Sequence, residues 1–439
     1  MHHAPSDRRN RNPLRGAQGM NLVAHPSDLS GRIEVPSSKS HMQRLLAAGL
    51  LAKGESWIRR PSHGADAMAA AEVAAGLGAD IEIGEDALKM RGGLSPRTDI
   101  LHLGESGLGM RLFSPIAALA STPMTMMAEG SLKGRPMQTM ADALTALGAE
   151  VNLNTGRPPI QLKGPLSGGH VTLDGGTSSQ FLTGLLMALP CAAADSVLEV
   201  SNLKSKPYVD MTLEVLSSTG ISIHHEDHQR FSIPGGQHYL PFDETVAGDW
   251  SAGAFLLILA ALCGEPFLEV DGLGNQPTQA DQAVTGALLL SGAKLMRTET
   301  GIRVERGRRK GFRFDATHCP DLFPPLAAFA AFCKGPTVIT GLHRLQHKES
   351  DRGTALQEEF AKAGIQIDLN STEDTLTVRP GPIQAAKLSG RGDHRMVMAA
   401  AVLGLAGAPI EIEGVEAVAK SYPDFFDALS EVGARFGKA

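Results

Sequence analysis

The sequence has few cysteines, few aromatic residues and no long apolar run. Its four cysteines are Cys191, Cys263, Cys319 and Cys333. They form no CxxC pair, which favours reduced thiols over a disulfide framework or a zinc site. No apolar run reaches the length that spans a bilayer without a polar interruption. We therefore expect a cytoplasmic protein that binds no metal and no membrane.

The chain also lacks an excess of basic charge. It has 41 lysines and arginines against 47 acidic residues, a formal net charge of −6, whereas nucleic-acid-binding proteins are usually basic overall. A few well-placed cations can still make one cleft attractive to anions. The length of 439 residues allows two domains, each with a full hydrophobic core. The expected partners are small molecules and not nucleic acid.

Residues 1–20 are set apart by four arginines, which are Arg8, Arg9, Arg11 and Arg15. No apolar segment follows them, so the stretch lacks the pattern of a secretory signal peptide. A transit peptide is the alternative, although serine is scarce in this stretch. The interpretation that we prefer is a disordered tail.

A long repeat organises the rest of the sequence. It is marked by Gly78, Gly148, Gly220, Gly292, Gly364 and Gly433, at intervals of 70, 72, 72, 72 and 69 residues. Each glycine ends an amphipathic helical pattern and precedes a short strand, and the first five are followed by a second strand, as in a hairpin. A glycine at such a helix end is expected to be left-handed. The pattern predicts an α/β fold of six βαβαββ-type units, three in each domain.

The earlier helix of each unit is apolar on nearly every side, so we expect it inside a domain. These helices, and several outer ones, begin with polar clusters. Serine and aspartate there are explained by helix capping, but a cation opposes the helix dipole unless an anion binds beside it. The cations in these clusters are Lys39, Arg44, Arg111, Arg135, Lys206, Lys348, Arg352, Arg395 and Lys420. Together they predict a pocket for several phosphates or carboxylates.

The polar clusters also resemble the sequence blocks of a known family. The blocks are SSKSHMQR at 37–44, TSSQFLTGLLMALP at 177–190, SKPYVDMTL at 205–213, HKESDR at 347–352, DHRMVMA at 393–399 and AKSYPDFF at 419–426. In this order they resemble the blocks of 5-enolpyruvylshikimate-3-phosphate (EPSP) synthases. The match runs from about Gly31 to the C-terminus, which makes the resemblance specific.

The resemblance implies the two-domain enolpyruvyl transferase fold, with the active site in the cleft between the domains. In that architecture the chain begins in one domain, completes the other and returns. Domain one would comprise residues 21–37 and 248–439, and domain two would comprise 38–247. The crossings would fall near 37–39 and 246–248.

The resemblance also implies a reaction, the transfer of the enolpyruvyl group from phosphoenolpyruvate to the 5-hydroxyl of shikimate 3-phosphate with release of phosphate. The shikimate 3-phosphate site would comprise Lys39, Ser40, Arg44, Ser178, Ser179, Gln180, Ser205, Tyr208, Asp321 and Lys348. The phosphoenolpyruvate site would comprise Lys39, Gly107, Arg135, Gln180, Arg352, Arg395 and Lys420. Arginine suits these roles because its planar guanidinium binds carboxylate and phosphate in a bidentate manner.

This chemistry needs two proton-transfer groups, one for the acceptor hydroxyl and one for the methylene carbon of the enol. By the same resemblance, Asp321 would serve the hydroxyl and Glu349 the methylene, while Lys39 would assist by proton transfer or charge stabilisation. Cations lower the pKa of a carboxyl group, so the surroundings of Glu349 must counter that effect. No cofactor is expected, because the enol phosphate carries its own reactivity. We expect a monomer.

Four positions depart from the usual family pattern. In the loop before Arg111, Glu105 and Leu108 stand where the better-known form has asparagine and threonine, and Leu112 follows where it has proline. Glu105 is expected to pair with Arg111 or another nearby cation. Arg344 stands where many members carry asparagine, and it either adds a contact or points elsewhere.

Other polar groups have simpler explanations. HHEDH at 224–228 is interpreted as a solvated hairpin turn in preference to a metal site. His394 is interpreted as a structural residue, and Asp249, Asp281 and Asp393 as helix caps.

Three other functions remain open at this stage. A UDP-N-acetylglucosamine enolpyruvyl transferase would share the fold and the donor, but it typically uses a cysteine in a mobile loop, and residues 104–136 contain none. A non-catalytic anion-binding relative is disfavoured by the presence of Asp321, Glu349 and Lys39. A nucleic-acid end-processing enzyme of similar repeat architecture is disfavoured by the acidic net charge.

Overall fold

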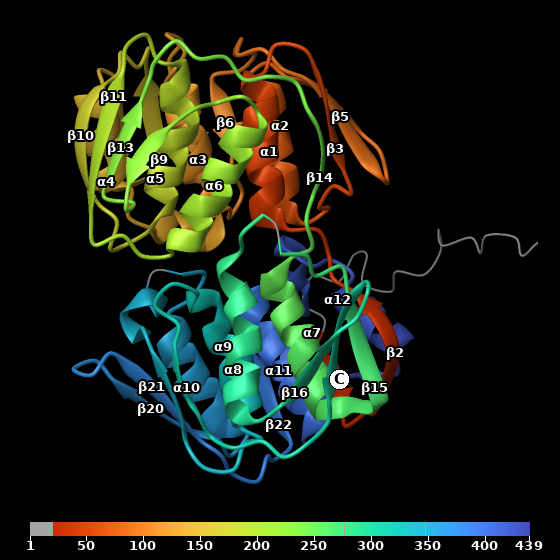
Figure 1. The fold of residues 1–439 in the computed structure, drawn as a ribbon. Helices are drawn as coiled ribbons and strands as arrows, with labels where there is room; N and C mark the ends of the chain where they lie inside the picture. The colour runs from red at the N-terminus through yellow and green to blue at the C-terminus, as the bar shows by residue number, and fades with distance from the viewer. Residues whose placement is uncertain (1–20, 276, 347) are drawn as a thin grey trace, which may run out of the picture.

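The chain forms two lobes that are joined by two stretches of backbone (Figure 1). The computed structural model describes residues 21–275, 277–346 and 348–439, so the tail predicted at 1–20 lies outside the described residues. One hydrophobic core draws its residues from 22–35 and 250–434, and the other from 42–246. We call the surrounding parts lobe 1 (21–37 and 248–439) and lobe 2 (38–247). As domain boundaries, these limits stay a prediction.

Within the described residues, lobe 2 contains three four-stranded sheets, in each of which every strand pairs with the next one named. The first comprises β14 (Asp243–Thr245), β3 (Glu55–Arg59), β5 (Ala87–Arg91) and β4 (Asp80–Ile83). The second comprises β6 (Ile100–His102), β7 (Met124–Met127), β9 (Arg157–Lys163) and β8 (Glu150–Asn154). The third comprises β10 (Gly169–Asp174), β11 (Ser196–Ser201), β13 (Arg230–Ile233) and β12 (His224–Glu226).

The described part of lobe 1 contains three sheets of the same design. The first comprises β2 (Leu29–Glu34), β15 (Gly264–Asp271), β17 (Gly301–Glu305) and β16 (Lys294–Arg297). The second comprises β18 (Arg313–Asp315), β19 (Thr337–Thr340), β21 (Thr375–Arg379) and β20 (Gln366–Asn370). The third comprises β22 (Ala386–Ser389), β23 (Ile410–Glu413), β1 (Leu22–His25) and β24 (Arg435–Lys438). In all six sheets the first two strands are parallel and the other neighbours antiparallel.

Each sheet is accompanied by an inner and an outer helix. In lobe 2 the helices are α1 (Lys39–Leu51), α2 (Ala65–Gly76), α3 (Gly107–Ala117), α4 (Gln138–Ala146), α5 (Gln180–Ala188) and α6 (Lys206–Ser218). In lobe 1 they are α7 (Trp250–Cys263), α8 (Val284–Ser291), α9 (Phe323–Ala330), α10 (Arg352–Lys362), α11 (His394–Ala406) and α12 (Phe425–Glu431). The six glycines of the repeat all have φ between +82° and +125°, as their place after a helix requires. The predicted fold of six repeated units is confirmed.

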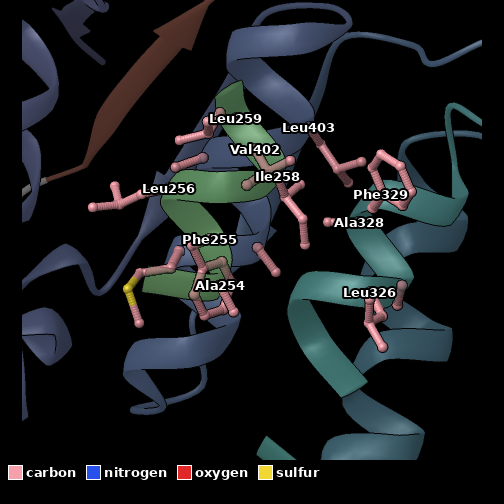
Figure 2. Packing of buried hydrophobic residues seen from close by; sticks show 14 of the residues in the cluster. Ala254, Phe255, Leu256, Ile258, Leu259, Leu326, Ala328, Phe329, Val402 and Leu403 are labelled. Carbon is pink, nitrogen blue, oxygen red and sulfur yellow. The ribbon is translucent and has the colours of Figure 1, made fainter. Parts of the chain in front are cut away.

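The inner helices form the centre of each lobe, as their apolar sequences predict. Every residue of α7 is buried. In Figure 2, Ile258 of α7 points toward Val402 of α11 and Ala328 of α9, and all three belong to one cluster of buried residues. Burying one such side chain contributes ~1.5–3 kcal/mol, so these three largely apolar helices supply much of the stability of lobe 1. This rigid centre holds the N-terminal ends of α9 and α11 in fixed positions.

The two backbone stretches between the lobes lie side by side. The Ser38 N–H donates to the Ala247 carbonyl at 2.7 Å, and the Asp249 N–H donates to the Pro36 carbonyl at 2.8 Å. His41 Nδ1 accepts a hydrogen bond from the Ala247 N–H at 3.1 Å. The chain therefore leaves lobe 1 and returns to it at one place.

The described residues hold neither a candidate membrane span nor a candidate metal centre. None of their helices is long and apolar enough to cross a bilayer, and no group of three or more His, Cys, Asp or Glu could hold a metal ion. In the hairpin at 224–228, His228 pairs with Asp210 at 2.6 Å. The four cysteines are free thiols.

Candidate active site

A cavity of about 390 Å³ lies between the lobes and is lined by both of them. The predicted site residues on its wall are Lys39, Ser40, Arg44, Gly107, Arg135, Ser178, Ser179, Gln180, Ser205, Tyr208, Asp321, Lys348, Glu349 and Arg395. Of the residues assigned to the two substrate sites, only Arg352 and Lys420 are absent from the wall. Residues that are far apart in the sequence thus meet in one place.

Helix N-termini bring the lobe 2 residues to the cavity. Lys39, Gly107 and Gln180 are the first residues of α1, α3 and α5, and all three line the wall. Ser38 caps α1 by accepting from the His41 N–H, and Ser106 caps α3 by accepting from the Gly109 N–H. Because the first N–H groups of a helix lack partners within it, these ends favour anions.

Asp321 is surrounded by three cations. It accepts hydrogen bonds from Arg352 Nη1 at 2.6 Å and Arg395 Nη2 at 3.1 Å, and Lys348 Nζ lies 3.3 Å away. Burial by itself would raise the pKa of Asp321, but Arg395, Lys348 and Arg352 outweigh it and hold this pKa well below its usual range. Asp321 is therefore ionised.

Glu349 also lies among cations, but its partners come from both lobes. Arg352 Nη2 donates to its Oε2 at 2.6 Å, and Arg135 Nη2 of lobe 2 lies 3.4 Å from its Oε1. Burial would raise the pKa of Glu349, but Arg352 and Arg135 outweigh it and keep this pKa well below the usual value. The conflict that the sequence predicts between these cations and a proton-donating Glu349 is thus present in the structure.

Arg352 lies behind these carboxylates and not on the cavity wall. Its side chain is fully buried, and its Nε donates to Asp393 Oδ2 at 2.7 Å. Asp393 also accepts from the Arg395 N–H at 3.0 Å, so its predicted role as the cap of α11 is confirmed. Arg352 therefore fixes three acidic side chains from one position, and its direct contact with a substrate stays a prediction.

Lys39 pairs with Asp66, a residue that no sequence pattern singles out. The Lys39 Nζ donates to Asp66 Oδ2 at 2.9 Å, and Asp66 lies in the first turn of α2. Burial would lower the pKa of Lys39, but Asp66 and Glu349 outweigh it and raise this pKa. Lys39 thus stays charged. Asp66 occurs in no polar block, and only the packing of α2 against α1 brings it to the cavity.

Arg44 contributes another positive charge to the cavity wall. The guanidinium of Arg44 is buried and donates to the Tyr208 carbonyl at 3.0 Å and to Thr212 Oγ1 at 2.9 Å. Burial lowers its pKa to about 10, which leaves it cationic at neutral pH. Ser178 and Ser205 line the same cavity, so its wall offers hydroxyl groups together with this fixed positive charge.

Two positions that depart from the family pattern make contacts between the lobes. Arg344 Nη1 donates to the carbonyls of Gly176 at 2.7 Å and Thr177 at 3.0 Å, and its Nη2 donates to Ser205 Oγ at 3.1 Å. Of the two outcomes expected for Arg344, the structure shows the first, because Arg344 adds contacts and does not point elsewhere. It also lines the cavity.

The second such position is Glu105, and its expected pairing with a nearby cation is confirmed. The partner is Lys420 of lobe 1, whose Nζ lies 3.0 Å from Glu105 Oε1. Lys420 also donates to the Gly392 carbonyl at 2.6 Å, which keeps it off the cavity wall. Its direct contact with a substrate stays a prediction.

Two expectations from the sequence are wrong. Lys206 does not share the cavity and lines a separate hollow together with Lys204 and His318. The reason is helical geometry, since Lys206 and Tyr208 are two residues apart and so point ~200° away from each other around α6. Asp281 is not a helix cap, because neither α8 nor the turn before it has a side-chain capping hydrogen bond. Asp249, by contrast, caps α7 as predicted.

Comparison with known proteins identifies the family. Residues 23–429 match the family model described as EPSP synthase (3-phosphoshikimate 1-carboxyvinyltransferase). The chain is 35% identical to the 3-phosphoshikimate 1-carboxyvinyltransferase of Methanocorpusculum labreanum, over 94% of this chain and 99% of that protein. It is 36% identical to the protein of the same name from Acetivibrio thermocellus, over 94% and 99% of the two chains. The structure of EPSP synthase from Acinetobacter baumannii covers 96% of this chain and 100% of its own, at 26% identity and a TM-score of 0.80.

Proposed function

The chain belongs to the EPSP synthase family and catalyses the 3-phosphoshikimate 1-carboxyvinyltransferase reaction of the shikimate pathway, and we propose that both substrates bind in the cavity between the lobes. The charge of the wall supports this proposal best. The wall carries seven lysines and arginines against three carboxylates. An excess of four positive charges in a buried space favours ligands that bring several negative charges, as phosphoenolpyruvate and shikimate 3-phosphate do.

Shikimate 3-phosphate occupies the part of the cavity around Arg44. Ser178, Ser179 and Ser205 donate hydroxyl hydrogen bonds to its phosphate, and Lys348 neutralises part of the phosphate charge. Arg44 and Tyr208 bind the other end of the acceptor. The support for this arrangement is that these groups line one continuous wall.

Phosphoenolpyruvate occupies the part between Lys39, Arg135 and Arg395. Gln180 lines the same cavity and contacts both substrates in this proposal, and its Oε1 already accepts from Arg111 Nη1 at 2.7 Å. The first N–H groups of α3, at Gly107, add an electrostatic attraction for the donor anion. Arg352 and Lys420 contribute to this charge from behind the wall.

The reaction is an addition followed by an elimination. Asp321 takes the proton of the acceptor 5-hydroxyl as its oxygen bonds to the central carbon of phosphoenolpyruvate. Glu349 gives a proton to the methylene carbon, which becomes a methyl group. The bond from the central carbon to the phosphate oxygen then breaks, phosphate leaves with the proton held by Asp321, and the methyl group returns its proton to Glu349. Lys39 stabilises the negative charge that moves onto the phosphate.

The donor itself resolves the conflict at Glu349. Arg352 and Arg135 by themselves favour the ionised carboxylate. The carboxylate and phosphate of phosphoenolpyruvate compete for Arg135, and their negative charge raises the pKa of Glu349. Glu349 therefore gains its proton when the donor arrives, which is when the proton is needed.

The replacement Glu349→Gln tests this assignment. The variant should bind both substrates nearly normally but turn over ~10²- to 10⁴-fold more slowly, the usual size of a lost acid–base group. The measurement is phosphate release from phosphoenolpyruvate with shikimate 3-phosphate, with substrate binding followed by calorimetry. Asp351→Asn is the matched control, because Asp351 lies two residues away and only caps α10. Normal turnover in the Glu349 variant would refute its role.

A cytoplasmic location and a monomeric state are also part of this proposal. Both can be checked by fractionating cells and by measuring the mass of the protein in solution.

A further inference from the structure

Asp281 is a fully buried carboxyl group that the proposed reaction does not use. It lies in a short turn (η3, Ala280–Ala283) of lobe 1 and is not part of the cavity wall. Its Oδ2 accepts hydrogen bonds from Ser251 Oγ and, at 3.4 Å, from the hydroxyl of Tyr208. Its Oδ1 is buried and has no hydrogen-bond partner among the described residues. A buried carboxylate oxygen without a partner is costly and calls for an explanation.

The hydrogen bond to Tyr208 connects Asp281 to the acceptor part of the cavity. Tyr208 belongs to α6 of lobe 2 and lines the wall, so the pair forms between the two lobes. A tyrosine hydroxyl has one hydrogen to donate. While that hydrogen goes to an ionised Asp281, Tyr208 presents only lone pairs to the cavity. Lone pairs repel the oxygen of an anion, whereas a donated hydrogen would bind it.

A proton on Asp281 reverses this arrangement. The acid then donates its own hydrogen to the Tyr208 oxygen, and the Tyr208 hydrogen becomes free for an anion in the cavity. The groups around Asp281 make this exchange accessible. Burial is the largest influence and raises the pKa of Asp281 to about 6, the charge of Asp321 also acts to raise it, and Arg395 and the Ser251 hydrogen bond oppose them.

Two other ionisable groups lie near Asp281. Asp249 of lobe 1 adds a small upward effect on the same pKa. The thiol of Cys319 stays neutral, because burial raises its own pKa far above the physiological range. An acceptor anion adds negative charge on the far side of Tyr208 and favours protonation of Asp281 further.

We propose that Asp281 is a positioning residue that sets the direction in which the Tyr208 hydroxyl donates, so that the acceptor anion is bound together with a proton on Asp281. This rests on the proposed role of Tyr208 in binding shikimate 3-phosphate. It makes acceptor affinity depend on pH through a group that touches no substrate. Above pH 6 the acceptor must bind with uptake of one proton, so its KM should rise by up to ~10-fold per pH unit.

The replacement Asp281→Asn tests the proposal, because asparagine has nearly the same shape and can donate to Tyr208 at every pH. We expect the acceptor KM of this variant to stay low between pH 6 and 8, where that of the unmodified protein rises, with kcat nearly unchanged. The phosphate of the substrate also titrates near pH 6, but it does so equally with both proteins. The difference between the two pH profiles therefore reports Asp281 alone.

Calorimetry in buffers of different ionisation enthalpy gives a second readout. The unmodified protein should take up a proton on binding shikimate 3-phosphate at pH 7.5, and the Asp281→Asn protein should take up less. Asp249→Asn is the matched control, a buried acid in the same region that caps α7, and its profile should follow that of the unmodified protein. Thermal unfolding of each variant checks that the fold is retained.

Tyr208→Phe separates this inference from the proposed function. If this variant leaves the acceptor KM unchanged, the assignment of Tyr208 to the acceptor site is wrong, and the inference with it. If it raises the KM by ~10-fold or more while Asp281→Asn keeps the pH profile of the unmodified protein, the site is right and the inference is overturned. If Asp281→Asn does not fold, Ser251→Ala replaces it, since loss of that hydrogen bond should move the rise in KM to higher pH.

Discussion

Replacing Arg344 by asparagine would show how far contacts between the lobes hold the cavity closed. Arg344 of lobe 1 donates to the carbonyls of Gly176 and Thr177 and to Ser205 Oγ, all in lobe 2. Only 8% of the residue is exposed, so water does not compete with these bonds while the lobes are together. Asparagine is shorter, and it can replace at most part of them.

The size of the effect follows from these bonds. When the lobes separate, water takes over each hydrogen bond, so the relevant value is the net ~0.5–1.5 kcal/mol per bond and not the larger value in a dry interior. Three bonds, of which asparagine restores about one, give a loss of about 1–3 kcal/mol. This corresponds to a ~5- to ~150-fold increase in the ratio of open to closed molecules.

Small-angle X-ray scattering of the ligand-free protein measures this ratio. The Arg344→Asn protein should have a larger radius of gyration than the unmodified protein, and both should reach the same smaller value with both substrates bound. The acceptor KM should rise as well, because part of the binding free energy then goes into closing the lobes.

Arg309→Asn is the matched control for this measurement. Arg309 Nη1 donates to the Ala261 carbonyl at 2.9 Å, and both residues belong to lobe 1. This control should lose stability without a change in radius. An unchanged radius and an unchanged acceptor KM in the Arg344 variant would show that these bonds do not govern closure.

Three further predictions concern buried or paired charges. Glu105→Gln should lower the KM for phosphoenolpyruvate by up to ~5-fold, because it frees Lys420 from a partly exposed ion pair. Steady-state kinetics with varied phosphoenolpyruvate would detect the change, and a raised KM would contradict it. Asp393→Ala should lower the free energy of unfolding by ~3–5 kcal/mol in denaturant experiments, because it leaves Arg352 buried without its main partner. A decrease of less than ~1 kcal/mol would show that the pair contributes little to stability. Burial lowers the pKa of His41 from its ordinary value to about 3. As the pH falls from 6.5 to 3, only the unfolded chain therefore binds a proton at His41, and the stability of the folded protein should decrease. His41→Asn keeps an acceptor for the Ala247 N–H and should flatten this fall in unfolding experiments at pH 4–7, whereas an unchanged slope would exclude His41 as the cause.

The parts of the fold that repeat were predictable from the sequence. Gly148 and Gly364, for example, lie at helix ends where only glycine takes a positive φ without strain, so the backbone requirement appears directly in the sequence. The inner helices were predictable for a similar reason, since α7 is buried on every side and its sequence is apolar at nearly every position.

The candidate site was predictable where its residues begin helices. Lys39 and Gln180 occur in polar blocks at the start of α1 and α5, and these blocks carry both the capping and the family signal. The partners of those residues were not predictable. Asp66 and Lys39 are 27 residues apart, and Lys420 and Glu105 belong to different lobes, so each pair depends on how helices and lobes pack.

Asp281 shows the same limit in another form. Its sequence position fits a helix cap, and capping is the commonest role of an aspartate before a helix. The structure instead buries it between Ser251 of its own lobe and Tyr208 of the other lobe. Nothing in the local sequence distinguishes these two outcomes, because the difference lies in contacts 30 and 73 residues away along the chain.

The adjacent crossings between the lobes predict that lobe 2 is a self-contained insert. Ser38 and Ala247 are joined by one backbone hydrogen bond, so the segment between them starts and finishes at a single point. A segment of this kind can be cut out without stretching either remaining end, and lobe 2 has its own hydrophobic core. Residues 38–247 should therefore fold when produced alone, and a short loop across the gap should leave lobe 1 as a smaller protein in its own right.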